Sequence, residues 1–126
     1  MPIPLRTEEE VEMIKQYILL PLMLDVLESD RESLESVKLK ASQVYGGIIR
    51  LLQAYTTAEL AQVRRDIREH GMKVYEERRT ELGIEARYLC RGYTYEFSLL
   101  WGVANAEIKQ RFFNYLGIDV TKEGIL

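Results

Sequence analysis

Apolar residues recur at three- and four-residue steps over most of the chain, which is the spacing of one face of an α-helix. Between residues 34 and 55 they fill one side of a helical wheel, with Glu35, Gln43 and Arg50 on the opposite side. Residues 57–82 repeat the pattern on a narrower stripe. The predicted helices cover residues 8–28, 30–55, 57–82 and 85–116.

Three capping boxes mark predicted helix starts, each a serine or threonine followed three residues later by glutamate. They are Thr7 with Glu10, Ser29 with Glu32, and Thr56 with Glu59. Gly83 and Gly117, each followed by isoleucine, mark predicted helix ends, because glycine tolerates the left-handed conformation that closes a helix. Pro21 is expected to kink or break the first helix, since it lacks an amide hydrogen.

Short connections between these helices predict antiparallel neighbours. The expected fold is therefore all-α: an up-down four-helix bundle with long helices and a short extended C-terminal tail. A chain of 126 residues fits a single helical domain, residues 1–126, which can bury a core without disulfides or metals.

One segment allows a second interpretation. Residues 87–97 are rich in tyrosine, so they can form two short strands that turn at Arg91 and Gly92. The four-residue spacing of Leu89, Tyr93 and Phe97 favours the helix.

The predicted helix over residues 85–116 carries two apolar faces, whereas a surface helix of a monomeric bundle needs only one. This pattern predicts a homodimer with the second face as its interface. The predicted interface residues are Tyr88, Tyr95, Leu99, Val103 and Phe113. The alternative is that this helix is wedged among the other three.

Polar residues between those two faces form a possible polar site. Glu107 and Arg111 are four residues apart, which favours an ion pair on one helix. Glu96 has Arg91 and several tyrosines nearby in sequence. A carboxylate in such a setting either binds a ligand or hydrogen-bonds a tyrosine to fix packing.

Composition narrows the class of protein. The net charge is −3, so nucleic acid is not an expected partner. No apolar stretch approaches the ~20 residues of a membrane span, and a single cysteine suits a reducing compartment. We therefore expect a soluble, cytoplasmic protein. With one histidine and one cysteine, ligand counting predicts no metal site and no cofactor.

One short motif points to enzymatic chemistry. Arg65, Asp66 and His70 stand in an Arg-x4-His spacing with a polar residue after the arginine. This spacing resembles the ribonuclease motif of the HEPN superfamily, all-helical proteins that act as dimers. The resemblance covers six residues and implies that Arg65 steadies a phosphate, His70 acts on the ribose hydroxyl or the leaving oxygen, and Asp66 supports the geometry.

Two functional hypotheses follow. The first is a non-enzymatic interaction or regulatory protein that acts through protein–protein contacts, with itself or with another protein. The alternative is a small HEPN-like ribonuclease that uses Arg65 and His70.

Overall fold

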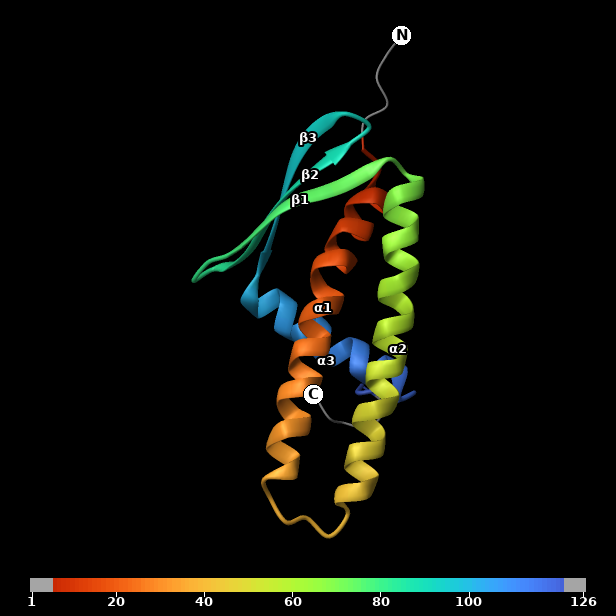
Figure 1. Ribbon diagram of the computed structural model, residues 1–126, viewed down its shortest axis with the longest axis vertical. Helices are drawn as coiled ribbons and strands as arrows, with labels where there is room; N and C mark the ends of the chain where they lie inside the picture. Colours follow the sequence, from red (N-terminus) through yellow and green to blue (C-terminus); the bar gives the residue numbers. More distant parts are fainter. Residues whose placement is uncertain (1–5, 122–126) are drawn as a thin grey trace.

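The computed structural model describes residues 6–121 and shows an α+β fold. Two long helices form an antiparallel hairpin, a three-stranded antiparallel sheet packs along half of it, and a third helix follows the sheet (Figure 1). The all-α four-helix bundle predicted from the sequence is wrong, because residues 72–100 form strands. Among the described residues, no helix combines the length and apolar character needed to cross a membrane.

Helix α1 (Glu8–Glu35) is longer than predicted. It begins at a complete capping box, in which Thr7 Oγ1 accepts from the Glu10 amide (3.1 Å) and the Glu10 carboxylate accepts from the Thr7 amide (2.9 Å). The helix then continues through Pro21 and Ser29. A helix start at Ser29 is therefore wrong; ion pairs of Arg31 with Glu28 and Glu35 span this region and support unbroken helix.

Helix α2 (Ser42–Glu69) is displaced from its predicted bounds. The predicted start at Thr56 is wrong, because the Thr56 hydroxyl lies inside the helix and donates to the Leu52 carbonyl at 2.7 Å. The predicted end at Gly83 is wrong as well. The helix closes at His70, followed by Gly71 with a φ of 68°, the left-handed conformation that suits glycine after a helix.

The sheet contains β1 (Met72–Arg79), β2 (Gly83–Cys90) and β3 (Tyr93–Leu100) in the order β1-β2-β3. Strands β2 and β3 turn at Arg91 and Gly92, whose positive φ angles (50° and 87°) are those of a two-residue hairpin loop. The strand interpretation of residues 87–97 is confirmed, and a continuous helix over 85–116 is wrong.

Helix α3 (Trp101–Tyr115) begins directly after β3. Its end is the one that the sequence predicted. Gly117 has a φ of 70°, the Gly117 amide donates to the Asn114 carbonyl, and the Ile118 amide donates to the Phe113 carbonyl. This pair of bonds closes the helix in a Schellman motif. The last five residues of the predicted C-terminal tail lie outside the described residues.

The core lies where the sheet and α3 meet the hairpin. Alternate residues of β2, Ile84, Ala86, Tyr88 and Cys90, are buried and face the helices. A larger cluster joins Ile84 and Ala86 to residues 18–23 of α1, Leu60 of α2 and the buried face of α3. A smaller cluster joins Tyr88 and Cys90 to Ile14 of α1 and Ile67 of α2. The end of the hairpin that carries the 36–41 loop extends beyond these clusters (Figure 1).

Candidate functional site

The part of the hairpin that extends past the sheet and α3, residues 26–55, is here called the tip. Within it, Leu27 and Leu52 are the buried residues, and the buried Thr56 follows directly after it. Between the two helices runs an open groove of about 480 Å³. The groove is lined by Asp30, Ser33, Leu34, Val37, Tyr45, Ile48 and Ile49.

Apolar side chains continue beyond the groove on the same side of α2. Val44, Ile48, Leu51 and Tyr55 are three or four residues apart, which places them on one helix face. Val44 is 61% exposed and Leu51 44% exposed. The tip face is defined by these residues and the apolar groove lining: Leu34, Val37, Val44, Tyr45, Ile48, Ile49, Leu51 and Tyr55. A contiguous apolar patch of this kind marks an interaction surface.

The tip face continues the surface on which α3 packs. Asp30 lines the tip groove and also a second groove of about 350 Å³ between α1 and α3, which includes Trp101 and Ile108. The Tyr55 ring lies 5.5 Å from the Tyr115 ring of α3. Helix α3 therefore covers this side of the hairpin in the middle of the molecule and leaves the tip uncovered.

A polar cluster at the opposite end of the hairpin joins three elements. Glu10 of α1 is 2% exposed, and its carboxylate accepts hydrogen bonds from Arg91 Nη1 (2.5 Å) and Nη2 (3.1 Å). His70 Nδ1, at the end of α2, lies 3.2 Å from Glu10 Oε2. The cluster ties the start of α1 to the end of α2 and to the β2–β3 turn.

The charge state of this cluster is fixed by its hydrogen bonds. The Arg91 side chain lowers the pKa of Glu10 from 4.5 to about 2, against the opposing effect of burial, and the Thr7 amide and His70 add to the lowering. A carboxylate that stays ionised and whose two oxygens are both engaged has no role as a general acid near neutral pH. The cluster is therefore a structural tie.

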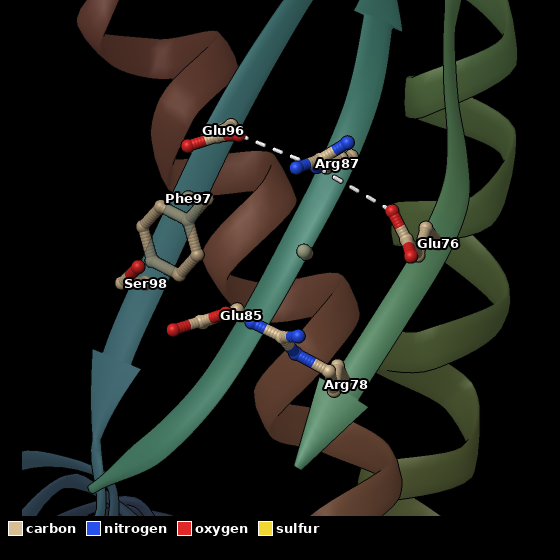
Figure 2. Close-up of a pocket in the computed structure, with 8 residues that line it drawn as sticks. Glu76, Arg78, Glu85, Arg87, Glu96, Phe97 and Ser98 are labelled. Carbon is tan, nitrogen blue, oxygen red and sulfur yellow. Dashed lines mark hydrogen bonds and ion pairs between the residues drawn. The ribbon is translucent and has the colours of Figure 1, made fainter. Parts of the chain in front are cut away.

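The outer face of the sheet carries a second polar surface, a shallow groove of about 240 Å³ (Figure 2). Arg87 on the central strand lies between Glu76 (3.4 Å) and Glu96 (3.3 Å) of the two flanking strands (Figure 2). Arg78 pairs with Glu85 at 2.5 Å. All five side chains are about half exposed or more, so these are solvated ion pairs that satisfy one another.

The motif residues of the HEPN resemblance lie on or at the end of α2. Arg65 donates to Gln62 at 2.6 Å, and Asp66 accepts from the same glutamine at 2.8 Å. His70, by contrast, lies against Glu10. The all-helical fold that the resemblance implies is contradicted by the sheet.

The predicted polar site is divided among different elements. Arg91 binds Glu10, and Glu96 pairs with Arg87 across the sheet. The predicted ion pair between Glu107 and Arg111 is wrong, because each of these α3 residues binds the helical hairpin instead. Glu107 pairs with Lys15 of α1 at 2.6 Å, and Arg111 binds Gln16 and Glu59.

The predicted interface on a single helix is also wrong, because no such helix exists. Tyr88 and Leu99 are buried in the core, at 1% and 5% exposure. Tyr95 is half-buried on β3, where it stacks on Tyr88. Val103 is exposed and Phe113 is half-buried on α3. These five residues form no common surface.

Sequence reasoning missed the tip face as a site, although it found the helical pattern that makes it. Residues 34–55 were expected to pack into a four-helix core, and among residues 6–121 only two helices lie there. The signal that could have found it was the full apolar helical face of residues 34–55, which needs more neighbouring helices to cover it than the fold supplies.

A family model described as YhjD protein matches residues 5–120. No curated protein and no solved structure matches the chain. The family match includes both hairpin helices, the sheet and α3. The chain therefore belongs to the YhjD protein family.

Proposed function

We propose that this protein is a non-enzymatic interaction protein that binds a polypeptide partner through the tip face. The observation that carries the proposal is the open groove of about 480 Å³, whose lining is mainly apolar and lies between two exposed helices. Burial of its half-exposed side chains is favourable, at roughly 25 cal/mol for each Å² of apolar surface removed from water.

The shape of the tip face favours a helical partner. Higher on the same side of the hairpin, α3 lies against α1 and α2, so this surface already accepts one helix. An apolar groove between two helices is the usual receptor for the apolar face of an amphipathic helix. We expect the partner to present such a face.

The polar clusters support the interaction role over the ribonuclease alternative. His70 faces the ionised Glu10 rather than an open groove, and Arg65 and Asp66 are engaged with Gln62. The charged outer face of the sheet is balanced by its own ion pairs. We assign the protein to the cytoplasm because its single cysteine, Cys90, is a buried thiol, and unpaired thiols suit a reducing compartment.

Site-directed photo-crosslinking in living cells tests this proposal. A photoreactive phenylalanine analogue replaces Val44 in the full chain, and a matched control carries the same analogue at Thr94, which is exposed on the outer face of the sheet. We expect a discrete protein adduct from position 44 and none from position 94. Irradiation that yields no adduct at position 44, with the variant folded and expressed normally, would overturn the proposal.

A further inference from the structure

We infer that the occupant of the tip face is the tip of a second copy of this chain, joined antiparallel across a twofold axis. The two hairpins then form a four-helix layer, with the sheets at opposite ends. This inference rests on the proposed function, because it names the partner of the same surface.

The first observation is that, within residues 6–121, no third element covers the tip groove. Elsewhere the hairpin is covered by the sheet and α3, and residues 18–23 of α1 are buried or nearly so on every side. Beyond Asp30 and Tyr55, which lie at the edge of α3, the described part of the chain places only the two helices against each other. Leu34, Ile48 and Ile49 along their seam remain partly exposed. A second helical pair would supply the missing layer and complete a four-helix arrangement.

The position of α3 decides the direction of approach. Because α3 lies on the same side of the hairpin as the tip groove, two copies with their tips pointing the same way would bring their α3 helices into collision. With the tips pointing in opposite directions, each tip instead ends beside the α3 of its partner. The twofold dimer is thus antiparallel, the closed arrangement commonest among homo-oligomers.

The charges of the tip are self-complementary in that arrangement. Residues 25–35 of α1 contain five acidic residues and one arginine, whereas residues 36–55 contain two lysines, one arginine and no acidic residue. Antiparallel overlap places the loop of one copy, with Lys38 and Lys40, over the C-terminal part of the partner's α1, where Asp30 lies. Opposite charges across an interface steer association and fix its register.

Three of these charges have no partner among the described residues of one chain. Over residues 6–121, Asp30, Lys38 and Lys40 make no ion pair and no side-chain hydrogen bond, although Asp30 sits at the edge of the apolar groove. Asp30 lines the tip groove, and Lys38 and Lys40 lie in the loop that follows Val37 of the groove lining. A twofold rotation of one tip onto another therefore brings opposite charges together.

Sedimentation of the purified full chain tests the inference. We expect a dimer at micromolar concentration. Val44→Asp should raise the dissociation constant about 100-fold, because an unpaired carboxylate in an apolar contact is costly. Lys73→Asp, on an exposed position of β1 far from the tip, should leave the dissociation constant unchanged. Both variants should keep the helix and strand content of the wild type by circular dichroism, since both positions are exposed in the single chain.

Charge complementation tests the antiparallel register. Asp30→Lys places like charges against Lys38 and Lys40 of an identical partner, and the double variant Lys38→Glu with Lys40→Glu places like charges against Asp30. Each variant alone should dissociate at least about tenfold more readily. A mixture of the two should form a heterodimer as stable as the wild type, because both contacts then join opposite charges.

The outcomes separate this inference from the proposed function. A photo-adduct at position 44 with twice the mass of the chain supports both the interaction proposal and the second copy as its partner. An adduct with a different protein, together with a purified chain that sediments as a monomer, overturns the second copy and leaves the interaction proposal standing. A dimer that Val44→Asp does not weaken overturns the inference, and so does a mixture of charge variants that fails to restore association.

Discussion

Arg91 and Glu10 are 81 residues apart in the sequence and are joined by two hydrogen bonds, from Nη1 to Oε2 at 2.5 Å and from Nη2 to Oε1 at 3.1 Å. Arg91 also has a positive φ of 50°, unusual for a residue other than glycine. The turn between β2 and β3 therefore holds a strained residue whose side chain neutralises a buried carboxylate at the start of α1.

We predict that Arg91→Asn destabilises the fold by about 3 kcal/mol, because a buried carboxylate loses its cation. Asparagine tolerates the left-handed backbone, and Asn-Gly suits this turn, so the loss reports on the ion pair rather than the turn. Urea unfolding followed by the fluorescence of Trp101, the single tryptophan, measures it. The control Arg78→Asn removes an exposed pair and should cost under about 1 kcal/mol. Equal losses in the two variants would contradict the structural role of the Glu10 cluster.

The low pKa of Glu10 predicts how stability falls in acid. The folded-state pKa is about 2 and the ordinary value is 4.5, so the folded state favours the ionised form. This contribution to stability is complete above pH 4.5 and is lost as the pH falls from 4.5 towards 2. Urea titrations of wild type and Glu10→Gln should show a stability gap that is constant above that window and narrows within it.

The exposed neighbour Glu9 provides the control for the loss of a glutamate at the start of α1. At neutral pH, Glu9→Gln should cost much less stability than Glu10→Gln, because its side chain is exposed. A gap between wild type and Glu10→Gln that keeps its neutral-pH size down to pH 2 would show that Glu10 titrates as an ordinary glutamate.

Two glycine-to-alanine substitutions should have opposite effects. In Gly83→Ala, the added Cβ overlaps the backbone of Leu99 on the paired strand, so we expect severe destabilisation, of several kcal/mol. In Gly102→Ala, the added Cβ meets nothing within 4 Å in the first turn of α3, and we expect a gain of about 0.5 kcal/mol. Thermal melts followed by circular dichroism compare them; a Gly83→Ala chain as stable as wild type would contradict the close pairing of β2 and β3.

Local stability should differ along the hairpin. Amides of residues 42–52 in α2 should exchange with deuterium faster than those of residues 58–68, because the second segment packs on the sheet and the first lies in the uncovered tip. Peptide-level exchange measured on dilute protein tests this difference. Uniform protection along α2 would mean that the tip is as stable as the rest of the helix.

The sequence predicted the helical elements better than the sheet, and the reason lies in particular positions. Leu89, Tyr93 and Phe97 are four residues apart. This spacing fits one face of a helix, and it fits one face of a strand equally well, because residues an even number apart in a strand share a face. The deciding signal was the alternation of Ile84, Ala86 and Tyr88, all buried, with the charged Glu85 and Arg87. The turn at Arg91 and Gly92 and the helix stop at Gly71 were further strand signals.

The polar sites depended on long-range contacts that spacing does not reveal. The Thr7–Glu10 capping box was predicted and is confirmed, because both partners lie within one helical turn. Arg91, which also binds the Glu10 carboxylate, comes from the sheet and could not be predicted from local spacing. In the same way, Glu107 forms its ion pair with Lys15 of α1 and not with Arg111, its neighbour on α3.

The charges on the outer face of the sheet also encode its alignment. Beyond the bulge, Glu76 faces Arg87 and Arg78 faces Glu85. If β1 slipped two residues along β2 in one direction, Glu76 would face Glu85; a slip in the other direction would set Arg78 against Arg87. Like charges directly opposite are unfavourable. Each nearest misalignment that keeps the apolar face inward therefore creates a repulsive pair, so these solvated ion pairs specify which pairing the strands adopt even where they add little to stability.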